Sequence, residues 1–364
     1  MMNSSKIDLE TIGWDLFFEE GFYPYQIQGL IPGRITQVQR KSCTALTEMG
    51  EIEVKVSGKF RFDTFEKGSY PVVGDWVGIK KEFKDDKGII QVVLPRRSKF
   101  SRKVAGRVTE EQIIVANVDI VWIVSSLDND FNIQRIERYL TLVSESGSKP
   151  VVILNKSDLC NDPYGRIEQV KRIAPSTPIH SLSAELNQGL DILNRYLGKG
   201  KTIALLGSSG VGKSTIVNRL LGVDRQKVGP VRESDSHGRH ITTYREMIML
   251  PNGGMIIDNP GMREIQLWSK GDGLNDVFKD IEEVAQYCRF RDCIHESEPG
   301  CAVKDALDKG ELDHRRYIHY LKLRKEVEFL SIKQNEMVRS TEKAKWKNIA
   351  KYGREMRKLK TGED

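Results

Sequence analysis

The strongest chemical signal in the chain is a glycine-rich loop between an apolar strand-like run and a helix-like run. Residues 203–218 read IALLGSSGVGKSTIVN, so the pattern Gly-x4-Gly-Lys-Ser runs from Gly207 to Ser214. Glycines allow a tight turn whose N–H groups face a phosphate, and the helix adds the positive end of its dipole. Lys213 would reach the β- and γ-phosphates, and the Ser214 hydroxyl would ligate Mg²⁺. The loop therefore predicts nucleoside triphosphate binding. The predicted phosphate-site residues are Gly207, Ser208, Ser209, Gly210, Val211, Gly212, Lys213, Ser214 and Thr215.

A second pattern predicts which base the nucleotide carries. Residues 151–158 read VVILNKSD, an apolar strand that ends in Asn-Lys-Ser-Asp. The Asp158 carboxylate can accept hydrogen bonds from the N1–H and the exocyclic amine of guanine, whereas adenine presents no such pair of donors. Asn155 would tie this loop to the phosphate loop, and the stem of Lys156 would cover the face of the base. Together with Ser157, these residues predict a guanine site.

The order of the motifs along the chain is unusual. Ser183 and Ala184 follow another short strand and suit a second base-contacting loop, and like Asn-Lys-x-Asp they precede the phosphate loop. Residues 258–261, Asp-Asn-Pro-Gly, come later as an Asp-x-x-Gly element. In it Asp258 would hold Mg²⁺ through water, and the Gly261 N–H would sense the γ-phosphate. These motifs resemble those of TRAFAC-type GTPases, in which the phosphate loop comes first. The resemblance implies a circularly permuted GTPase domain with the same sheet and site.

A polar segment between the phosphate loop and Asp258 is expected to supply the switch and the catalytic group. We expect Thr243 to complete the Mg²⁺ shell, with Thr242 as the alternative. Many GTPases place a glutamine directly after Asp-x-x-Gly to orient the attacking water, but here that position is Met262. His240, just before the threonines, is the candidate to position water instead. The competing interpretation of His240 is a surface or partner-contacting histidine.

A cluster of cysteines predicts a metal site. Residues 288–301 read CRFRDCIHESEPGC, which gives Cys-x4-Cys-x-His-x5-Cys. Three thiolates and one imidazole satisfy tetrahedral Zn²⁺ and leave no open position, so the site would be structural. The alternative is a set of reduced, unpaired cysteines. An odd total of five cysteines argues for a reducing cytoplasm rather than a disulfide framework. The predicted zinc ligands are Cys288, Cys293, His295 and Cys301.

The pattern of apolar and polar residues along the chain predicts the helices and strands that must hold these groups. At about 100–200 residues per domain, 364 residues suggest two or three domains. About five short β-like runs between residues 30 and 94 fit a barrel of the OB type, with an SH3-like barrel as the competitor. Apolar strands then alternate with helical stretches, as in a buried parallel sheet, and helices follow. The expected fold is multidomain α/β: an N-terminal extension (1–28), an OB-type barrel (29–98), a circularly permuted P-loop GTPase domain (99–272), a helical zinc-binding domain (273–339) and a basic tail (340–364).

Charge is distributed unevenly along the chain. There are 57 Lys and Arg against 51 Asp and Glu, a net charge of +6. Residues 96–107 carry +6 and residues 340–360 carry another +6, so the remaining chain sums to −6. Two basic segments on an acidic body predict contact with RNA, and a solvated surface is the alternative. The chain shows neither an apolar membrane span nor a secretory signal, so we expect a cytoplasmic protein. The candidate RNA contacts are Arg96, Arg97, Lys99, Arg102, Lys103, Lys343, Lys345 and Lys347.

Several features together are similar to one known family. They are the OB-like barrel, the basic segment after it, the permuted motifs, GRHITT, DNPGMRE and the cysteine–histidine spacing. The combination closely resembles the ribosome small-subunit-dependent GTPase A family (RsgA, also called YjeQ) over about residues 28–335. The resemblance implies an enzyme that hydrolyses GTP to GDP and phosphate, and that binds the 30S subunit and its 16S rRNA as a monomer. It also implies action late in 30S maturation and stimulation by the subunit. Ile241 and Asn259 stand where the family commonly has threonine.

Two other functions fit the same residues. With Met262 in place of glutamine, the protein could be a nucleotide-gated RNA clamp in which GTP occupancy rather than turnover matters. A permuted GTPase acting on another RNA or on the large subunit is the other alternative, although the barrel and the zinc region count against it. GTP turnover measured alone, with 30S subunits and with 50S subunits would separate these functions.

Overall fold

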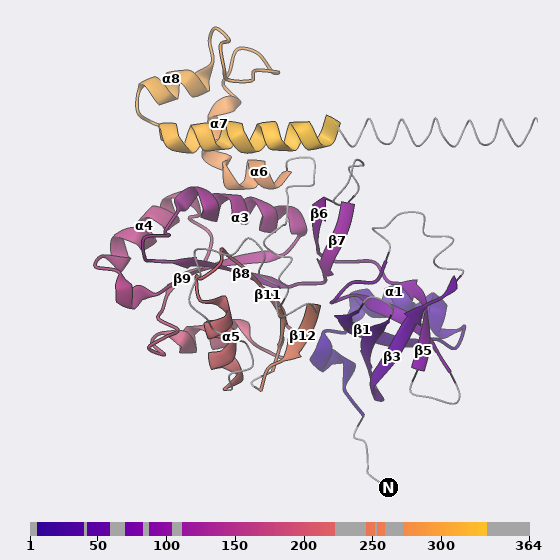
Figure 1. Cartoon of the computed structure of the whole chain (residues 1–364). Helices are drawn as coiled ribbons and strands as arrows, with labels where there is room; N and C mark the ends of the chain where they lie inside the picture. The colour runs from indigo at the N-terminus through magenta and orange to yellow at the C-terminus, as the bar shows by residue number, and fades with distance from the viewer. Residues whose placement is uncertain are drawn as a thin grey trace, which may run out of the picture.

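Five strands near the start of the chain close into a barrel in the computed structural model (Figure 1). They are β1 (Ile31–Val38), β2 (Cys43–Thr47), β3 (Gly50–Val56), β4 (Trp76–Lys81) and β5 (Lys87–Val93). The hydrogen-bonded order is β1-β2-β3-β5-β4, and β4 pairs back with β1. The β3–β5 pairing is parallel and the others are antiparallel. A five-stranded closure of this kind is the OB architecture, so the prediction of an OB-type barrel is confirmed.

The α/β domain continues the same hydrogen-bonded sheet. Its strands lie in the order β10-β9-β8-β11-β13-β12, and all are parallel to their neighbours except β12. β12 also pairs with β1, so one sheet of eleven strands runs through both domains. The strands are β8 (Ile120–Ser126), β9 (Lys149–Asn155), β10 (Ile179–Ser181), β11 (Thr202–Leu206), β12 (Arg245–Met249) and β13 (Met255–Asp258). A separate two-stranded sheet consists of β6 (Lys99–Lys103) and β7 (Glu111–Ala116).

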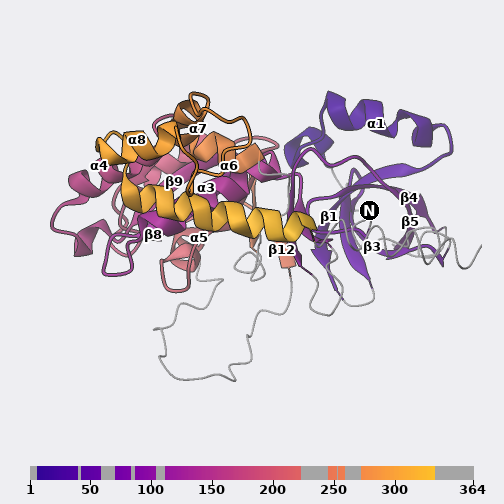
Figure 2. The same cartoon turned by 90° about the horizontal axis from the view of Figure 1, so that it is seen from above.

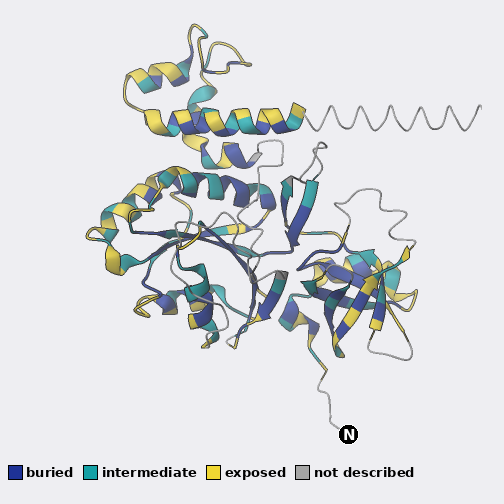
Figure 3. Cartoon of the chain, viewed as in Figure 1, coloured by how far each residue is buried: buried dark blue, intermediate teal, exposed yellow. Residues whose placement is uncertain are grey.

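Alternation along β8 shows how the sheet of the α/β domain is covered. Val121 and Ile123 belong to one apolar cluster, Trp122 and Val124 belong to another, and all four are buried. Successive side chains of a strand point to opposite faces, so both faces carry a core. Figure 3 shows the central strands of this sheet as buried (dark blue). The covering helices are α3 (Ile133–Ser146) and α4 (Pro163–Ile173) on one face and α5 (Lys213–Leu221) on the other, with the short 3-10 helices η3 (Ser157–Leu159) and η4 (Leu190–Tyr196) in the connections.

Residues 6–28 carry structure that the sequence pattern does not predict. The helix α1 (Leu16–Gln26) lies beside the barrel (Figure 2). Its Phe18 and Phe22, four residues apart, are buried. Just before it, Trp14 packs edge to face on Trp76 of β4, with ring centroids 4.7 Å apart. A helix of 11 residues that buries two side chains has too few turns to show a clear period in the sequence.

Charged groups of α3 hold a C-terminal helical domain over the α/β domain (Figure 1). The buried Glu137 of α3 accepts a hydrogen bond from the Arg316 guanidinium and lies 2.6 Å from His319 Nδ1. The next residue, Arg138, donates to Glu326 through two hydrogen bonds of 2.6 and 2.8 Å. The helices of this domain are α6 (Asp272–Val277), α7 (Lys279–Ala285), α8 (Ala302–Asp308) and a helical stretch over residues 314–332.

The barrel and the α/β domain meet around one buried guanidinium. Arg34 on β1 is 2% exposed. It donates to the carbonyl oxygen of Asn117 (2.9 Å) and to the hydroxyl of Thr202 (2.8 Å). It also donates to the carbonyl oxygen of Ile12, which ends the 3-10 helix η1 (Leu9–Ile12). Burial lowers the pKa of Arg34 to about 10, which still leaves a cation at neutral pH. One side chain therefore bonds the N-terminal segment, the barrel and the α/β sheet to one another.

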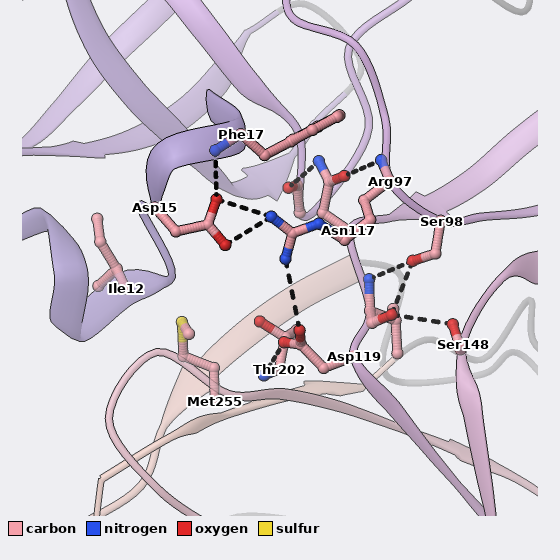
Figure 4. A network of polar contacts seen from close by, with 12 residues as sticks. Ile12, Asp15, Phe17, Arg97, Ser98, Asn117, Asp119, Ser148, Thr202 and Met255 are labelled. Atoms are coloured by element: carbon pink, nitrogen blue, oxygen red, sulfur yellow. Dashed lines mark hydrogen bonds and ion pairs between the residues drawn. The ribbon is translucent and has the colours of Figure 1, made fainter. Parts of the chain in front are cut away.

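Asn117 extends this junction on the side of the barrel (Figure 4). Its side chain accepts a hydrogen bond from the Arg97 N–H (2.9 Å) and donates to the Gly74 carbonyl oxygen (3.0 Å). Asn117 has a φ of 55°, a left-handed conformation that asparagine tolerates better than most residues. The Arg97 guanidinium in turn pairs with Asp15 at 2.5 Å and lies 4.0 Å from Asp119. The junction is therefore a continuous polar network rather than a single contact.

The structure describes residues 6–39, 42–58, 70–82, 87–103, 111–222, 245–251, 253–258 and 272–332. Within these ranges, no helix has the length and apolar character needed to cross a membrane. Several residues singled out in the sequence lie outside them: His240, Ile241, Thr242, Thr243, Asn259, Gly261, Met262, Lys343, Lys345, Lys347 and the rest of the tail 340–364. The side chains of Lys103 and Asp258 also lie outside the described part.

We expect Arg34→Met to lower the free energy of unfolding by roughly 3 kcal/mol, because methionine keeps the stem but leaves buried acceptors without a donor. Chemical denaturation followed by tryptophan fluorescence measures the change. Arg97→Ala is the matched control: its guanidinium side chain is 41% exposed, so its loss should cost less than about 1 kcal/mol. Equal losses for the two variants would contradict the role given to Arg34.

Candidate nucleotide site and metal centre

The phosphate loop follows β11 and opens into α5, at the carboxyl edge of the parallel sheet. A Cβ atom on Gly207 would lie 2.3 Å from the Val124 carbonyl oxygen, and one on Gly212 would lie 2.1 Å from Asn155 Nδ2. Gly212 also has a φ of 94°. Both positions need glycine, because any side chain would collide with the neighbouring strand or loop. The backbone of the loop is therefore packed directly into the edge of the sheet.

A cation is held over this loop. The ammonium of Lys213 donates to the carbonyl oxygens of Gly207 (2.9 Å) and Ser208 (2.6 Å). Ser214 and Thr215 follow in the first turn of α5 and are partly buried. A lysine and the N-terminus of a helix thus converge on the space in front of the loop, an arrangement that binds anions.

Asn155 joins three loops of the site. It is buried at the end of β9. Its Nδ2 donates to the carbonyl oxygen of Val211 in the phosphate loop (2.8 Å), and its Oδ1 accepts from the N–H of Ala184 (3.0 Å). The guanine loop is therefore bonded both to the phosphate loop and to the loop after β10. Since both ends of the amide are used, the orientation of Asn155 is fixed.

The rest of the guanine loop turns toward solvent. Lys156 has a φ of 60°, in the left-handed region. The Ser157 N–H donates to the carbonyl oxygen of Leu182 (3.1 Å), which holds the turn, and Ser183 Oγ accepts from a backbone N–H of its own loop (3.2 Å). Asp158 is exposed, and among the described residues its carboxylate has no hydrogen-bond or ion-pair partner. The loop therefore presents an open acceptor at the mouth of the site.

Three residues that the motifs do not mark also contact these loops. Arg219 of α5 donates to two carbonyl oxygens of the loop after β10, at 3.1 and 2.9 Å. Asp128 and Asp130, on the loop after β8, bond side chains of the guanine loop and of the phosphate loop. The two aspartates can be found from their place in the sheet, because β8 lies between β9 and β11 and its carboxyl end faces both loops. For Arg219 we find no local sequence signal.

The switch residues are only partly placed by the structure. β13 runs parallel to β11 and ends at Asp258, so the backbone of Asp258 lies at the same edge of the sheet as the phosphate loop. His240, Thr242, Thr243 and Gly261 fall outside the described residues. The site described here therefore consists of the loops that would hold the base and the phosphates.

The cysteine–histidine cluster comes together as a centre that could hold a metal ion. The four ligand atoms of Cys288, Cys293, His295 and Cys301 all lie within 4.8 Å of one another. His295 Nδ1 is 3.6 Å from Cys288 Sγ and 3.5 Å from Cys301 Sγ, and these two sulfurs are 3.9 Å apart. A tetrahedron with metal–sulfur bonds of about 2.3 Å and metal–nitrogen bonds of about 2.0 Å has sulfur–nitrogen edges of about 3.5 Å and sulfur–sulfur edges of about 3.8 Å. Cys288, His295 and Cys301 thus have the spacing of three corners of such a tetrahedron, and Cys293 Sγ lies within 4.8 Å of their ligand atoms.

Protonation of the cluster also suits a cation. Burial lowers the pKa of His295, so its ring is neutral near pH 7 and offers a lone pair. Burial raises the pKa of the Cys293 thiol to about 11, so a bound cation is needed to keep it as a thiolate. Glu298 braces the loop by accepting hydrogen bonds from the Ile294 N–H (2.8 Å) and from two further N–H groups, which lower the pKa of Glu298 to about 2.

The basic residues that follow the barrel are largely paired within the protein. The Arg96 guanidinium donates twice to the buried Asp75, each time at 2.7 Å. Lys99 pairs with Glu111 at 2.9 Å, and Arg102 donates to a glutamine side chain at 3.0 Å. Arg96 therefore serves the barrel junction, whereas Lys99 belongs to an exposed pair.

Comparison with known proteins decides the family. The RsgA GTPase family model matches residues 93–268. The small ribosomal subunit biogenesis GTPase RsgA of Opitutus terrae is 41% identical over 350 residues, which cover 94% of this chain and 95% of the relative. The chain belongs to the RsgA family. As an RsgA GTPase, it is a GTP-hydrolysing enzyme. The RsgA protein of Streptomyces avermitilis, 40% identical over 364 residues, covers 99% of this chain and is itself covered to 97%.

Solved structures agree with the RsgA fold. YjeQ from Thermotoga maritima matches with a TM-score of 0.60 and 26% identity, over 83% of this chain and 98% of that one. YloQ, described as a circularly permuted GTPase, matches with a TM-score of 0.57 and 25% identity, over 84% of this chain and 96% of that one. The resemblance drawn from the motifs and the permuted order are both confirmed.

Proposed function

We propose that this RsgA-family enzyme binds the small (30S) ribosomal subunit, acts late in the maturation of that subunit and is stimulated by it. The observation that carries the proposal is similarity over nearly the whole chain to relatives named small ribosomal subunit biogenesis GTPase. That similarity includes the barrel and the C-terminal domain as well as the GTPase domain. The enzyme would act in the cytoplasm as a monomer, and domain divisions after residues 28, 98, 272 and 339 belong to the same proposal.

GTP would lie across the carboxyl edge of the α/β sheet. The open Asp158 carboxylate would accept from guanine, Lys213 and the loop N–H groups would hold the phosphates, and Gly261 would sense the γ-phosphate. Hydroxyl and carboxylate oxygens are the donors that Mg²⁺ prefers, so the residue types fit this ion. When bound, Mg²⁺ would neutralise charge that develops on the phosphates. The proposed Mg²⁺ ligands are Ser214, Asp258 and Thr243, with Thr242 as the alternative.

His240 is the residue we propose to position the attacking water. Met262 occupies the place of the usual glutamine, and a thioether cannot orient water. An imidazole can both donate to and accept from water near neutral pH, which suits the task. Binding of the ribosomal subunit would bring this group into place, which accounts for stimulation.

We propose zinc as the metal of the cysteine–histidine centre. Three soft thiolates with one imidazole select zinc over the hard cations, and the spacing of Cys288, His295 and Cys301 fits tetrahedral coordination. Four protein donors leave no open position, so the ion would be structural. It would fix the loop between α7 and α8, whose large apolar side chains Tyr287, Phe290 and Ile294 are exposed.

The RNA that this protein binds would be 16S rRNA. OB barrels commonly bind nucleic acid through one face. Lys99 and Arg102 remain candidate contacts, as do Lys103 and the tail lysines Lys343, Lys345 and Lys347. Arg97 also remains a candidate, because its pair with Asp15 is exposed, whereas Arg96 contributes chiefly to the barrel junction, because its guanidinium group is bonded to the buried Asp75.

A nucleotide-gated RNA clamp is the second candidate, and Met262 is the observation that favours it. Without a water-orienting glutamine, occupancy by GTP could set RNA affinity while turnover stays slow. The two functions differ in whether the ribosomal subunit accelerates hydrolysis.

GTP turnover measured alone, with 30S subunits and with 50S subunits tests the proposal. We expect 30S subunits to raise turnover about tenfold or more, because contact with the subunit would complete the catalytic site around the γ-phosphate, and 50S subunits to have little effect. Absence of 30S stimulation would favour the clamp. His240→Ala is the accompanying variant: it should lower 30S-stimulated turnover about 10²-fold and leave GTP affinity largely intact. Unchanged stimulated turnover would remove His240 from the mechanism.

Asp158→Asn should weaken GTP binding on the order of 10³-fold, because the amide cannot accept both guanine donors. Xanthosine triphosphate should bind this variant better than GTP does, since its C2 oxygen can accept from the new amide. Calorimetric titration of both nucleotides measures the change, with ATP as the reference that should stay weak throughout. Retained preference for GTP would show that another residue reads the base.

Protein purified without chelator should contain about one zinc ion per chain. Removing the ion should lower the melting temperature of the C-terminal domain, because the loop between α7 and α8 loses its organising centre. Differential scanning calorimetry before and after chelation, with zinc or magnesium added back, measures this effect, and only zinc should restore stability. A zinc content far below one ion per chain would refute the assignment.

A further inference from the structure

The loop between β8 and α3, residues 127–132, lies between the two loops of the proposed nucleotide site. β8 pairs in parallel with β9 on one side and with β11 on the other. The carboxyl ends of parallel strands form one edge, which is where ligands bind in open α/β sheets. The loop thus borders both the guanine loop and the phosphate loop. It carries Asp128 and Asp130, which belong to none of the nucleotide-binding motifs.

Asp128 is bonded through both carboxylate oxygens. Oδ2 accepts from Lys156 Nζ of the guanine loop (2.8 Å), and Oδ1 accepts from Ser126 Oγ (2.7 Å) and from the Asp130 N–H (2.9 Å). The Lys156 and Asp128 side chains are only 30% and 26% exposed. Burial works against ionisation, but the hydrogen bonds from Lys156 and Ser126 outweigh it and lower the pKa of Asp128. The aspartate therefore stays charged, and the ammonium is held in one place.

Asp130 is bonded to the phosphate loop. Its Oδ2 accepts from Ser208 Oγ at 2.9 Å. Arg135, in the first turn of α3, donates to both carboxylate oxygens at 2.9 Å and lowers the pKa of Asp130. The Arg135 N–H donates to the N-cap residue, Asn132, at Oδ1 (3.0 Å). The start of α3 therefore fixes Arg135, and Arg135 in turn positions Asp130. The phosphate loop is thereby fastened to α3.

The paired cations decide what these aspartates can do. Two uncompensated carboxylates beside a polyphosphate would repel it. Here Asp128 is paired with Lys156 and Asp130 with Arg135, so the loop presents little net charge to a nucleotide. The four oxygens are also engaged with protein donors, which suits a structural task better than metal coordination.

We infer that Asp128 and Asp130 are positioning residues of the nucleotide site, an inference that rests on the proposed function of that site. Asp128 holds Lys156 so that its stem lies where the guanine ring is to be covered. Asp130 holds Ser208 and with it the turn of the phosphate loop. Ordering both before binding removes a cost that the nucleotide would otherwise meet. Asp128 therefore acts on affinity for the base, and Asp130 acts on affinity for the phosphates.

A double-mutant cycle tests Asp128, with the dissociation constants of guanosine and GDP for the full chain as the readout. Asp128→Ala should weaken both ligands about tenfold, because both contain the base. In a Lys156→Met background, which keeps the stem and removes the ammonium, the same substitution should change neither constant more than about twofold. An equal loss in both backgrounds would show that Asp128 acts through the fold, and would overturn the inference. If Asp128→Ala does not fold, the isosteric Asp128→Asn is tested against the same pattern.

Comparing GDP with guanosine, which lacks the phosphates, tests Asp130. Asp130→Ala should weaken GDP about tenfold and leave guanosine within about twofold, because guanosine does not touch the phosphate loop. Ser208→Ala should behave alike, and the double variant should lose no more than either single one. Equal weakening of guanosine and GDP would overturn the assignment, as would losses that add in the double variant. Asp130→Asn takes the place of Asp130→Ala if the alanine variant does not fold.

Asp308→Ala is the matched control, since it removes an exposed carboxylate of the C-terminal domain and should change neither constant. Wild-type binding separates this inference from the proposed function. Tight GDP binding that neither aspartate affects would refute the inference alone. Failure of the 30S subunit to stimulate turnover would refute the ribosomal function while leaving the aspartate tests unaffected.

Discussion

The buried guanidinium of Arg34 is the interaction on which the arrangement of the domains depends. A cation so deeply buried is stable only when its donors are used, and here the acceptors come from three separate parts of the chain. The barrel is thereby fixed to the α/β sheet at Arg34 of β1. Farther along the same strand, Gln37 pairs with Glu246 and Val38 with Arg245 of β12. The buried cation and the strand pairing support the same placement of one domain on the other.

In the permuted chain, the strand that joins the barrel, β12, borders the nucleotide site. β12 follows residues 223–244, which contain the proposed Mg²⁺ threonines, and it pairs with β13, which ends at Asp258. A displacement of β12 must be shared by β1 or must break the hydrogen bonds between them. On the far side, α3 begins beside the phosphate loop and carries Glu137 and Arg138, which hold the C-terminal domain. Both flanking domains are therefore attached to elements that border the nucleotide site.

The features that could be predicted from the sequence are those that require particular residue types within a few positions of one another. The phosphate loop needs glycine at fixed places, and the metal ligands need a close spacing, so each pattern lies within a few residues. The barrel strands can be recognised from their short runs of alternating apolar and polar residues. Arg34 could not be foreseen, because its partners Ile12 and Thr202 lie 22 and 168 residues away and no local pattern encodes them. Asp128 and Asp130 became interpretable only once the strand order placed β8 between the two binding loops.

The same limit applies to charge. The basic run after the barrel is conspicuous in the sequence, but in the fold Arg96 neutralises the buried Asp75. A cation bonded to a buried carboxylate cannot also neutralise an RNA phosphate, so it releases no counterion and adds nothing to the salt dependence of binding. Lys99 differs, because its side chain is 49% exposed and its pair with Glu111 is one that a phosphate can displace at small cost. RNA affinity in this segment must therefore come from cations whose internal partners are weak, and burial rather than residue type identifies them.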